Sequence, residues 1–195
     1  MPADPVARGG ALILAAGFAR RFGSDKRRHV LADGTPLLTA TVRRYAQVFD
    51  RIAVVIREGE DELAAELGAI HPGVRIVTAA DAALGMGHSL AAGVRAVAGD
   101  WSWVAVALGD MPWIRAATLT SLAHVFTASG STGILQPRSG NRSGHPVLFG
   151  ADCFDELLRL TGDTGARAVL ERHRDSVRHL DVDDPGIFAD MDRPG

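Results

Sequence analysis

Short apolar runs alternate with amphipathic stretches along the first two thirds of the chain. The runs have few polar interruptions, which is typical of strands that are buried on both faces of a sheet. Parallel strands of this kind need crossover connections, and helices usually provide them. The pattern therefore predicts four buried strands, at Gly10–Ala16, Ile52–Ile56, Val74–Val77 and Trp103–Leu108.

Helical periodicity marks the segments between these runs. In Pro36–Phe49 the apolar residues recur at intervals of four, three and four, which places them on one face of a helix. Glu60–Ile70 is rich in Ala, Glu and Leu and stops before Pro72. Ser89 is a suitable N-cap for a helix that runs to Val97. A further helix is predicted at Thr118–Ala128.

The last third of the chain is less regular. Two short apolar runs flank the polar turn SGNRSG, so they are candidates for a hairpin. Two helices and a last strand follow them. Alternating strands and helices predict an α/β fold with a mainly parallel sheet covered on both faces. The elements predicted here are strands at Gly133–Gln136, Pro146–Phe149 and Val177–Val182, and helices at Cys153–Leu160 and Ala166–His173.

Composition narrows the class of protein. The 195 residues are 47% hydrophobic and 23% charged, which predicts one globular domain over residues 1–195. The formal net charge of -2 gives no reason to expect a nucleic-acid partner. No apolar run reaches the ~20 residues that span a bilayer, and the first residues lack the apolar core of a signal peptide. With Cys153 as its one cysteine, the chain is expected to be a soluble cytoplasmic protein without a membrane partner.

The loop after the first predicted strand, Gly17–Arg28, is strongly basic. It holds five cationic residues and one acid, Asp25, so its charge is +4 in a chain whose total is -2. Gly17 and Gly23 allow the backbone to approach a ligand closely. These features favour a polyphosphate ligand, although a solvated basic loop would have the same composition. The cationic residues are Arg20, Arg21, Lys26, Arg27 and Arg28.

Two common phosphate-binding motifs do not match this loop. A Walker motif needs Gly-Lys-Ser/Thr, whereas Ser24 and Asp25 follow Gly23. A dinucleotide fingerprint needs glycines where Ala19 and Arg20 stand. A P-loop NTPase and an NAD-dependent oxidoreductase are therefore disfavoured.

Asp110 follows the strand predicted at Trp103–Leu108 directly. Ligands of open α/β sheets bind at the carboxyl ends of the strands, and Mg²⁺ prefers carboxylate oxygens together with substrate phosphates. Asp110 is thus a candidate magnesium ligand, or else a helix cap or turn residue before Pro112. A second acidic pair, Asp190 and Asp192, lies near the C-terminus and could equally be solvated.

The remaining reactive side chains give weaker signals. His88 and His145 lie in glycine-rich segments and are the histidines best placed to face a ligand. No pair of histidines has the H-x-x-x-H spacing, so a zinc site is not expected. Cys153 opens a predicted helix and is interpreted as a buried structural thiol rather than a nucleophile.

Several motifs together resemble a known family over nearly the whole chain. LAAGFARRFGSDK, at Leu14–Lys26, is similar to the L-A-A-G-x-S-x-R-M-G-x-x-K signature of MobA-like nucleotidyltransferases. Within that family the chain looks most like the molybdenum cofactor cytidylyltransferases. Further matches follow in the family's order: GTPLL, GMGHSLAAG, LGDMP, GHPVLF, GDTGAR and the closing ADMDRP.

The resemblance implies a three-layer αβα sandwich of the nucleotide-diphospho-sugar transferase type. It implies that the loop Ala16–Gly23 cradles the phosphates of a nucleoside triphosphate and that Arg21 and Lys26 are the catalytic cations. Asp110 matches the family's Mg²⁺ ligand, and Asp190 is the expected second ligand, with Asp192 as the competing choice. The nucleotide-binding residues implied are Leu14, Ala15, Ala16, Gly17, Gly23, Lys26, Ser89 and Asp110.

The function that the resemblance implies is transfer of CMP from CTP to a phosphate-bearing acceptor, molybdopterin, with release of pyrophosphate. CTP is favoured over GTP because guanylyl-transferring relatives have glycines where this chain has Ala15 and Ala16. A GTP-using molybdopterin guanylyltransferase is one alternative. Another is a non-catalytic accessory protein that delivers molybdenum cofactor to a molybdenum hydroxylase.

Overall fold

Four parallel strands form the centre of the sheet in the computed structural model, which describes residues 8–17 and 25–191. They are β1 (Gly9–Leu14), β2 (Ile52–Arg57), β3 (Val74–Ala79) and β4 (Trp103–Leu108), in the order β3-β2-β1-β4. β1 pairs with β2 and β4 on its two sides, and Leu14 is opposite both Val55 and Leu108. The connections that follow β1 and β4 therefore begin side by side. All four strands predicted from the apolar runs are confirmed.

The second half of the chain extends the sheet on the β4 side. β7 (Val147–Gly150) runs antiparallel to β4 and to β5 (Ile134–Ser139). β5 also forms a tight hairpin with β6 (Arg142–Ser143). The last strand, β8 (Arg178–Asp181), pairs with β5 in parallel. The two strands predicted on either side of SGNRSG correspond to β5 and β7, which pair antiparallel as expected, but the predicted turn itself contains β6. The predicted last strand is present as β8.

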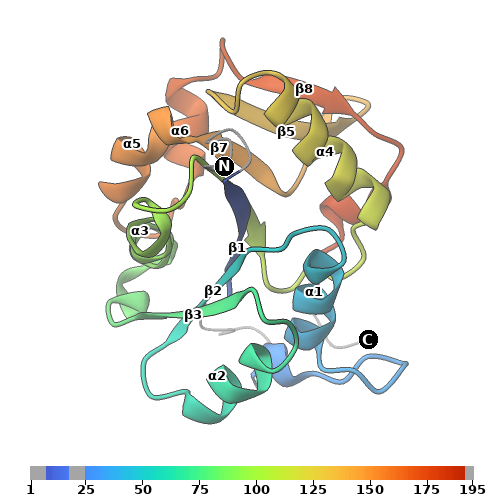
Figure 1. The fold of residues 1–195 in the computed structure, drawn as a ribbon, viewed down its shortest axis with the longest axis vertical. Coiled ribbons are helices and arrows are strands. Elements are labelled where there is room, and N and C mark those ends of the chain that lie inside the picture. The colour runs from blue at the N-terminus through green and yellow to red at the C-terminus, as the bar shows by residue number, and fades with distance from the viewer. Residues whose placement is uncertain (1–7, 18–24, 192–195) are drawn as a thin grey trace, which may run out of the picture.

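Helices cover both faces of the sheet and complete three layers (Figure 1). One face packs against α1 (Leu37–Ala46), α2 (Asp61–Gly68) and α4 (Ala116–Ala128). The other packs against α3 (Met86–Val97), α5 (Phe154–Leu158) and α6 (Arg167–Arg172). Single turns of 3-10 helix occur at η2 (Lys26–Arg28), η3 (Ala82–Leu84), η4 (Ala151–Cys153) and η5 (Pro185–Phe188). In the described part of the chain, no helix has the length and apolar character needed to cross a bilayer.

The structure shows that the helix cap predicted at Ser89 is wrong, and it excludes Asp110 as a helix cap. Ser89 does not cap α3, because the helix begins at Met86 and Gly85 is its N-cap. Gly85 has φ 125°, a conformation that residues with a side chain rarely adopt, so the glycine sets the start of the helix. Asp110 does not cap α4 either, since the N-cap is Arg115.

Candidate functional site

Lys26 and Asp110 meet at the carboxyl edge of the central strands. Lys26 lies on η2, which follows β1, and Asp110 follows the adjacent strand β4. The Lys26 Nζ atom is 2.5 Å from Asp110 Oδ2, and each side chain is less than a fifth exposed. A cation suited to phosphate and an anion suited to a metal ion therefore occupy one partly sheltered position.

The turn that carries Asp110 is held firmly against the end of β1. The Gly109 N–H donates to the Leu14 carbonyl at 2.9 Å, and the buried Thr41 hydroxyl donates to the Gly109 carbonyl at 3.0 Å. A Cβ atom on Gly109 would lie only 3.1 Å from Ala15 Cβ. The absence of a side chain at Gly109 lets the end of β1 and the Asp110 turn approach closely. This close approach fixes the position of the Asp110 backbone.

Arg27 is buried next to the site and holds its backbone in place, a role that the sequence motifs did not indicate. The residue is 6% exposed, and all five guanidinium N–H groups have acceptors. Nε and Nη2 donate to Asp25 at 2.8 and 2.6 Å, Nη1 donates to Glu60 at 2.7 Å, and Nη2 also donates to Glu60. Nη1 donates in addition to the Ala15 carbonyl at 2.9 Å. Arg27 thus ties η2 to the end of β1.

The ion-pair network around Arg27 changes the meaning of the basic loop. Burial lowers the pKa of Arg27, but the hydrogen bonds to Asp25 and Glu60 outweigh it, so the pKa stays above its ordinary value. Arg57 also pairs with these two carboxylates, at 3.3 and 2.7 Å. Arg28 is directed toward acidic side chains of α2. The charge of +4 is therefore partly neutralised by the fold, and Lys26 is the cation of η2 that faces Asp110.

A second carboxylate approaches from the C-terminal end of the described chain. The Met191 N–H donates to the Asp110 carbonyl at 3.2 Å, which brings the segment of Asp190 to the turn after β4. Both Asp110 and Asp190 influence the titration of His145. Burial lowers the pKa of His145, whereas the Asp110 and Asp190 carboxylates act to raise it. The Met191 hydrogen bond thus brings the segments of Asp110 and Asp190 together, and both carboxylates act on His145.

These residues fit a divalent cation that is shared with a substrate. In residues 8–17 and 25–191, no group of three or more His, Cys, Asp or Glu side chains could enclose a metal ion alone. Mg²⁺ is usually held by one or two carboxylates, with phosphate oxygens and water completing its shell. Asp110 and Asp190 are two carboxylates on segments that a backbone hydrogen bond brings together. Nδ1 of His145 is buried without a hydrogen-bond partner among the described residues, so a polar group near it would be stabilised.

The other predicted nucleotide-binding residues lie on the same edge or outside the described residues. Leu14 is half-buried at the end of β1, and Gly17 is exposed. Ala15 and Ala16 are buried and pack into the cores on opposite faces of the sheet. Ser89 is 4% exposed inside the first turns of α3. Arg21, Gly23 and Asp192 fall outside the residues that the structure describes.

Two further motifs meet although they are far apart in the sequence. The Gly87 N–H, from GMGHSLAAG, donates to the Gly162 carbonyl of GDTGAR at 2.7 Å. A Cβ atom on Gly85 would lie 2.4 Å from the backbone of Gly162, and one on Gly87 would lie 2.7 Å from Thr161 O. The glycines of both motifs therefore serve a close contact between the start of α3 and the segment after α5.

The profile of the MobA-like NTP transferase domain matches residues 11–177. The chain belongs to this family. The matched region contains Lys26, Asp110 and the glycine motifs, but ends before Asp190. Membership of the MobA-like family confirms the resemblance seen in the motifs, and the mainly parallel three-layer sheet confirms the fold class.

Relatives of this MobA-like protein include several solved structures. A Rv0371c homologue from Mycobacterium sp. strain JC1 is 31% identical, with a TM-score of 0.81, over 95% of this chain and 91% of that one. Rv0371c from Mycobacterium tuberculosis, solved in complex with manganese, is 28% identical, with a TM-score of 0.72, over 90% and 89% of the two chains. Molybdopterin-guanine dinucleotide biosynthesis protein A from Archaeoglobus fulgidus shares the fold, at 18% identity and a TM-score of 0.68, over 95% and 93%.

Among curated proteins, the bifunctional protein GlmU of Hyphomonas neptunium is 30% identical over 170 residues, 86% of this chain. The MobA-like chain spans 34% of that protein. The similarity therefore covers about a third of that longer protein, and not its whole length.

Proposed function

We propose that this MobA-like protein is a nucleotidyltransferase that moves CMP from CTP to a phosphate-bearing acceptor, molybdopterin, and releases pyrophosphate. The contact between Lys26 and Asp110 at 2.5 Å carries the proposal. It supports the proposal because a cation suited to phosphate lies beside a carboxylate suited to a metal ion, at the strand edge where open α/β sheets bind ligands.

The reaction brings two anions together, so charge neutralisation is the main task of the protein. A terminal phosphate oxygen of the acceptor attacks the α-phosphorus of CTP, and the bond to the bridging oxygen of the β-phosphate breaks. Pyrophosphate leaves with the bonding electrons. The phosphate nucleophile is already ionised at neutral pH, so no side chain has to remove a proton. Lys26 would neutralise the triphosphate, and Arg21 could bind its oxygens in a bidentate way.

Asp110 and Asp190 would hold Mg²⁺ in this proposal. A divalent cation supplies charge neutralisation and orients the phosphates. The manganese complex of Rv0371c supports a divalent ion in a related protein. The Lys26 ammonium and a metal ion would compete for the same Asp110 carboxylate. With an ion held there, the ammonium would pair with the phosphates of the nucleotide instead.

Exposed apolar side chains support an acceptor with a flat ring. Val30, Leu84, Met86 and Trp113 are large hydrophobic residues of the described chain that are at least 44% exposed. All four lie in the connections that follow β1, β3 and β4, and so belong to the carboxyl edge. Exposed apolar side chains in these connections suit a ligand with a ring system and a phosphate, such as molybdopterin. The region of Ser89 would contribute to recognition of the base or the acceptor.

The preference for CTP rests on Ala15 and Ala16. Their buried methyl groups hold the strand end at a fixed distance from the cores on both faces. Glycines at these positions would let the backbone recede and enlarge the space for a purine. A GTP-using enzyme remains the alternative outcome of the test.

The test is pyrophosphate release by the purified protein with molybdopterin and each of CTP, GTP, ATP and UTP, with and without Mg²⁺. Metal-dependent release with CTP supports the proposal, and release with GTP replaces the base assignment. If molybdopterin binds but no nucleotide supports turnover, the protein is an accessory carrier and the proposed reaction is wrong. Calorimetric titration with the four nucleotides separates weak binding from slow chemistry.

A further inference from the structure

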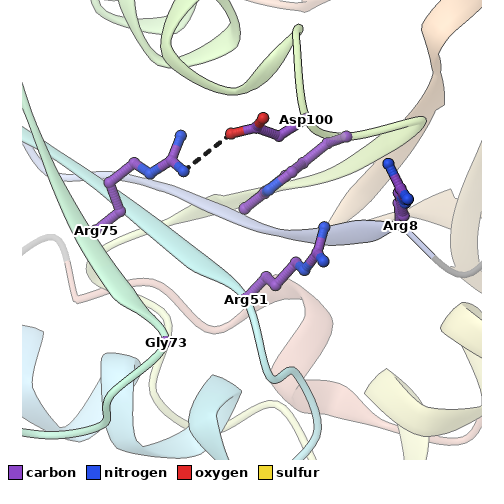
Figure 2. Close-up of a pocket in the computed structure, with 6 residues that line it drawn as sticks. Arg8, Arg51, Gly73, Arg75 and Asp100 are labelled. Carbon is purple, nitrogen blue, oxygen red and sulfur yellow. Dashed lines mark hydrogen bonds and ion pairs between the residues drawn. The ribbon is translucent and has the colours of Figure 1, made fainter. Parts of the chain in front are cut away.

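A pocket lies at the edge of the sheet opposite the Lys26–Asp110 contact, where the four parallel strands begin (Figure 2). Arg8, Arg51 and Gly73 immediately precede β1, β2 and β3. The pocket has a volume of about 320 Å³. Strands of this length, at about 3.3 Å per residue, hold it roughly 20 Å from the Lys26–Asp110 contact. Its lining is Arg8, Arg51, Gly73, Arg75, Asp100 and Trp101.

The lining is strongly positive. Three guanidinium groups and one carboxylate give it a charge of +2 (three minus one), within a chain of net charge -2. Arg75 is held by Asp100 at 3.0 Å and by the Ala96 carbonyl at 2.8 Å. Within the described ranges, the side chains of Arg8 and Arg51 form no ion pair. In Figure 2, Arg75 and Asp100 lie on one side of the pocket, and Arg8 and Arg51 lie toward the other.

The backbone under these arginines is fixed. The Ser102 N–H donates to the Arg8 carbonyl at 2.7 Å, and the Ala11 N–H donates to the Arg51 carbonyl at 3.0 Å. Trp101 is 6% exposed and packs so closely on Gly10 that a Cβ atom there would lie 2.7 Å from its ring. The arginine side chains therefore extend from a rigid floor, and a ligand would not have to order the backbone to bind.

We propose that this amino-edge pocket binds the phosphate group of a small phosphomonoester. Arg8 and Arg51 would each donate forked hydrogen bonds to phosphate oxygens, a geometry that suits guanidinium groups. A dianionic phosphate matches the charge of +2 and removes the repulsion between neighbouring guanidinium groups. The volume is at the lower end of the range for small-molecule sites, which leaves room for an organic group beside the phosphate. Binding here does not depend on the nucleotidyl transfer proposed above.

The test is calorimetric titration of the full chain with inorganic phosphate and with glucose 6-phosphate, at low salt and without metal or nucleotide. R8Q/R51Q should bind both probes about tenfold more weakly than the wild type, because each loses charge-assisted hydrogen bonds. R174Q is the matched control, since Arg174 is an exposed arginine away from the pocket lining, and its binding should be unchanged.

Each outcome decides the question. Tighter binding of glucose 6-phosphate than of inorganic phosphate identifies an ester as the ligand, whereas the reverse order overturns the ester and leaves a site for free phosphate. Undiminished binding in R8Q/R51Q, or no binding by the wild type, overturns the pocket as a phosphate site. Arg8 and Arg51 are exposed, so the variant is expected to fold, and R8K/R51K should recover part of the affinity.

Discussion

Replacement of Arg27 by methionine tests whether the buried ion network holds the site together. Methionine fills a similar volume without hydrogen-bond donors. The change removes the bonds to Asp25, Glu60 and the Ala15 carbonyl. Loss of one partner from a buried ion pair costs about 3–5 kcal/mol. Because Arg57 still pairs with Glu60 at 2.7 Å, we expect a smaller loss, about 2–4 kcal/mol in the free energy of unfolding.

Urea denaturation followed by circular dichroism measures this loss. With an m value of about 1–3 kcal/mol per molar urea, the midpoint should fall by roughly 1–2 M. R28M is the matched control, because Arg28 is 49% exposed on its side chain and its ion-pair distances are 3.6 and 4.0 Å. An exposed pair contributes about 1 kcal/mol or less, so R28M should unfold near the wild-type midpoint.

The comparison of R27M with R28M decides the outcome. Equal midpoints for the two variants would show that the Arg27 network does not stabilise the fold, and the reasoning from its five donors would be wrong. At temperatures where R27M is folded, we also expect slower pyrophosphate release, since the tie between η2 and the end of β1 is lost. Normal turnover in a destabilised R27M would separate stability from positioning of Lys26.

Further predictions follow from the site and the thiol. K26A should lower turnover by ~100-fold or more, as loss of one transition-state cation does elsewhere, and near wild-type turnover would remove Lys26 from the site. D110N should shift the Mg²⁺ titration to higher concentration, and an unchanged titration would leave Asp110 a structural role. A15G/A16G should raise activity with GTP relative to CTP, and unchanged selectivity would contradict the base assignment. Each glycine should also lower the free energy of unfolding by about 0.5–1 kcal/mol. Burial raises the pKa of Cys153 to about 11, so its thiol should react with a disulfide reagent roughly 100-fold more slowly at pH 8 in the folded protein than in urea.

The sequence alone predicted the elements whose signals are local. The apolar runs indicated β1 to β4, because a strand buried on both faces needs a continuous apolar segment. Motifs in the family's order indicated the transferase family, and the composition of Gly17–Arg28 indicated a basic loop after the first strand. Ser89 was assigned wrongly as a cap, since Gly85 sets the start of α3 through a backbone conformation that sequence pattern does not show.

Only the tertiary structure decided which charges face one another. Adjacency of β1 and β4 brings Lys26 to Asp110, and strand order in a parallel sheet depends on long-range packing rather than on local pattern. Arg27 and Lys26 are neighbours in the chain, yet one is buried among carboxylates of distant segments and the other faces the site. The amino-edge pocket arises in the same way, from residues that precede separate strands. Composition counts such charges, but the fold determines their partners.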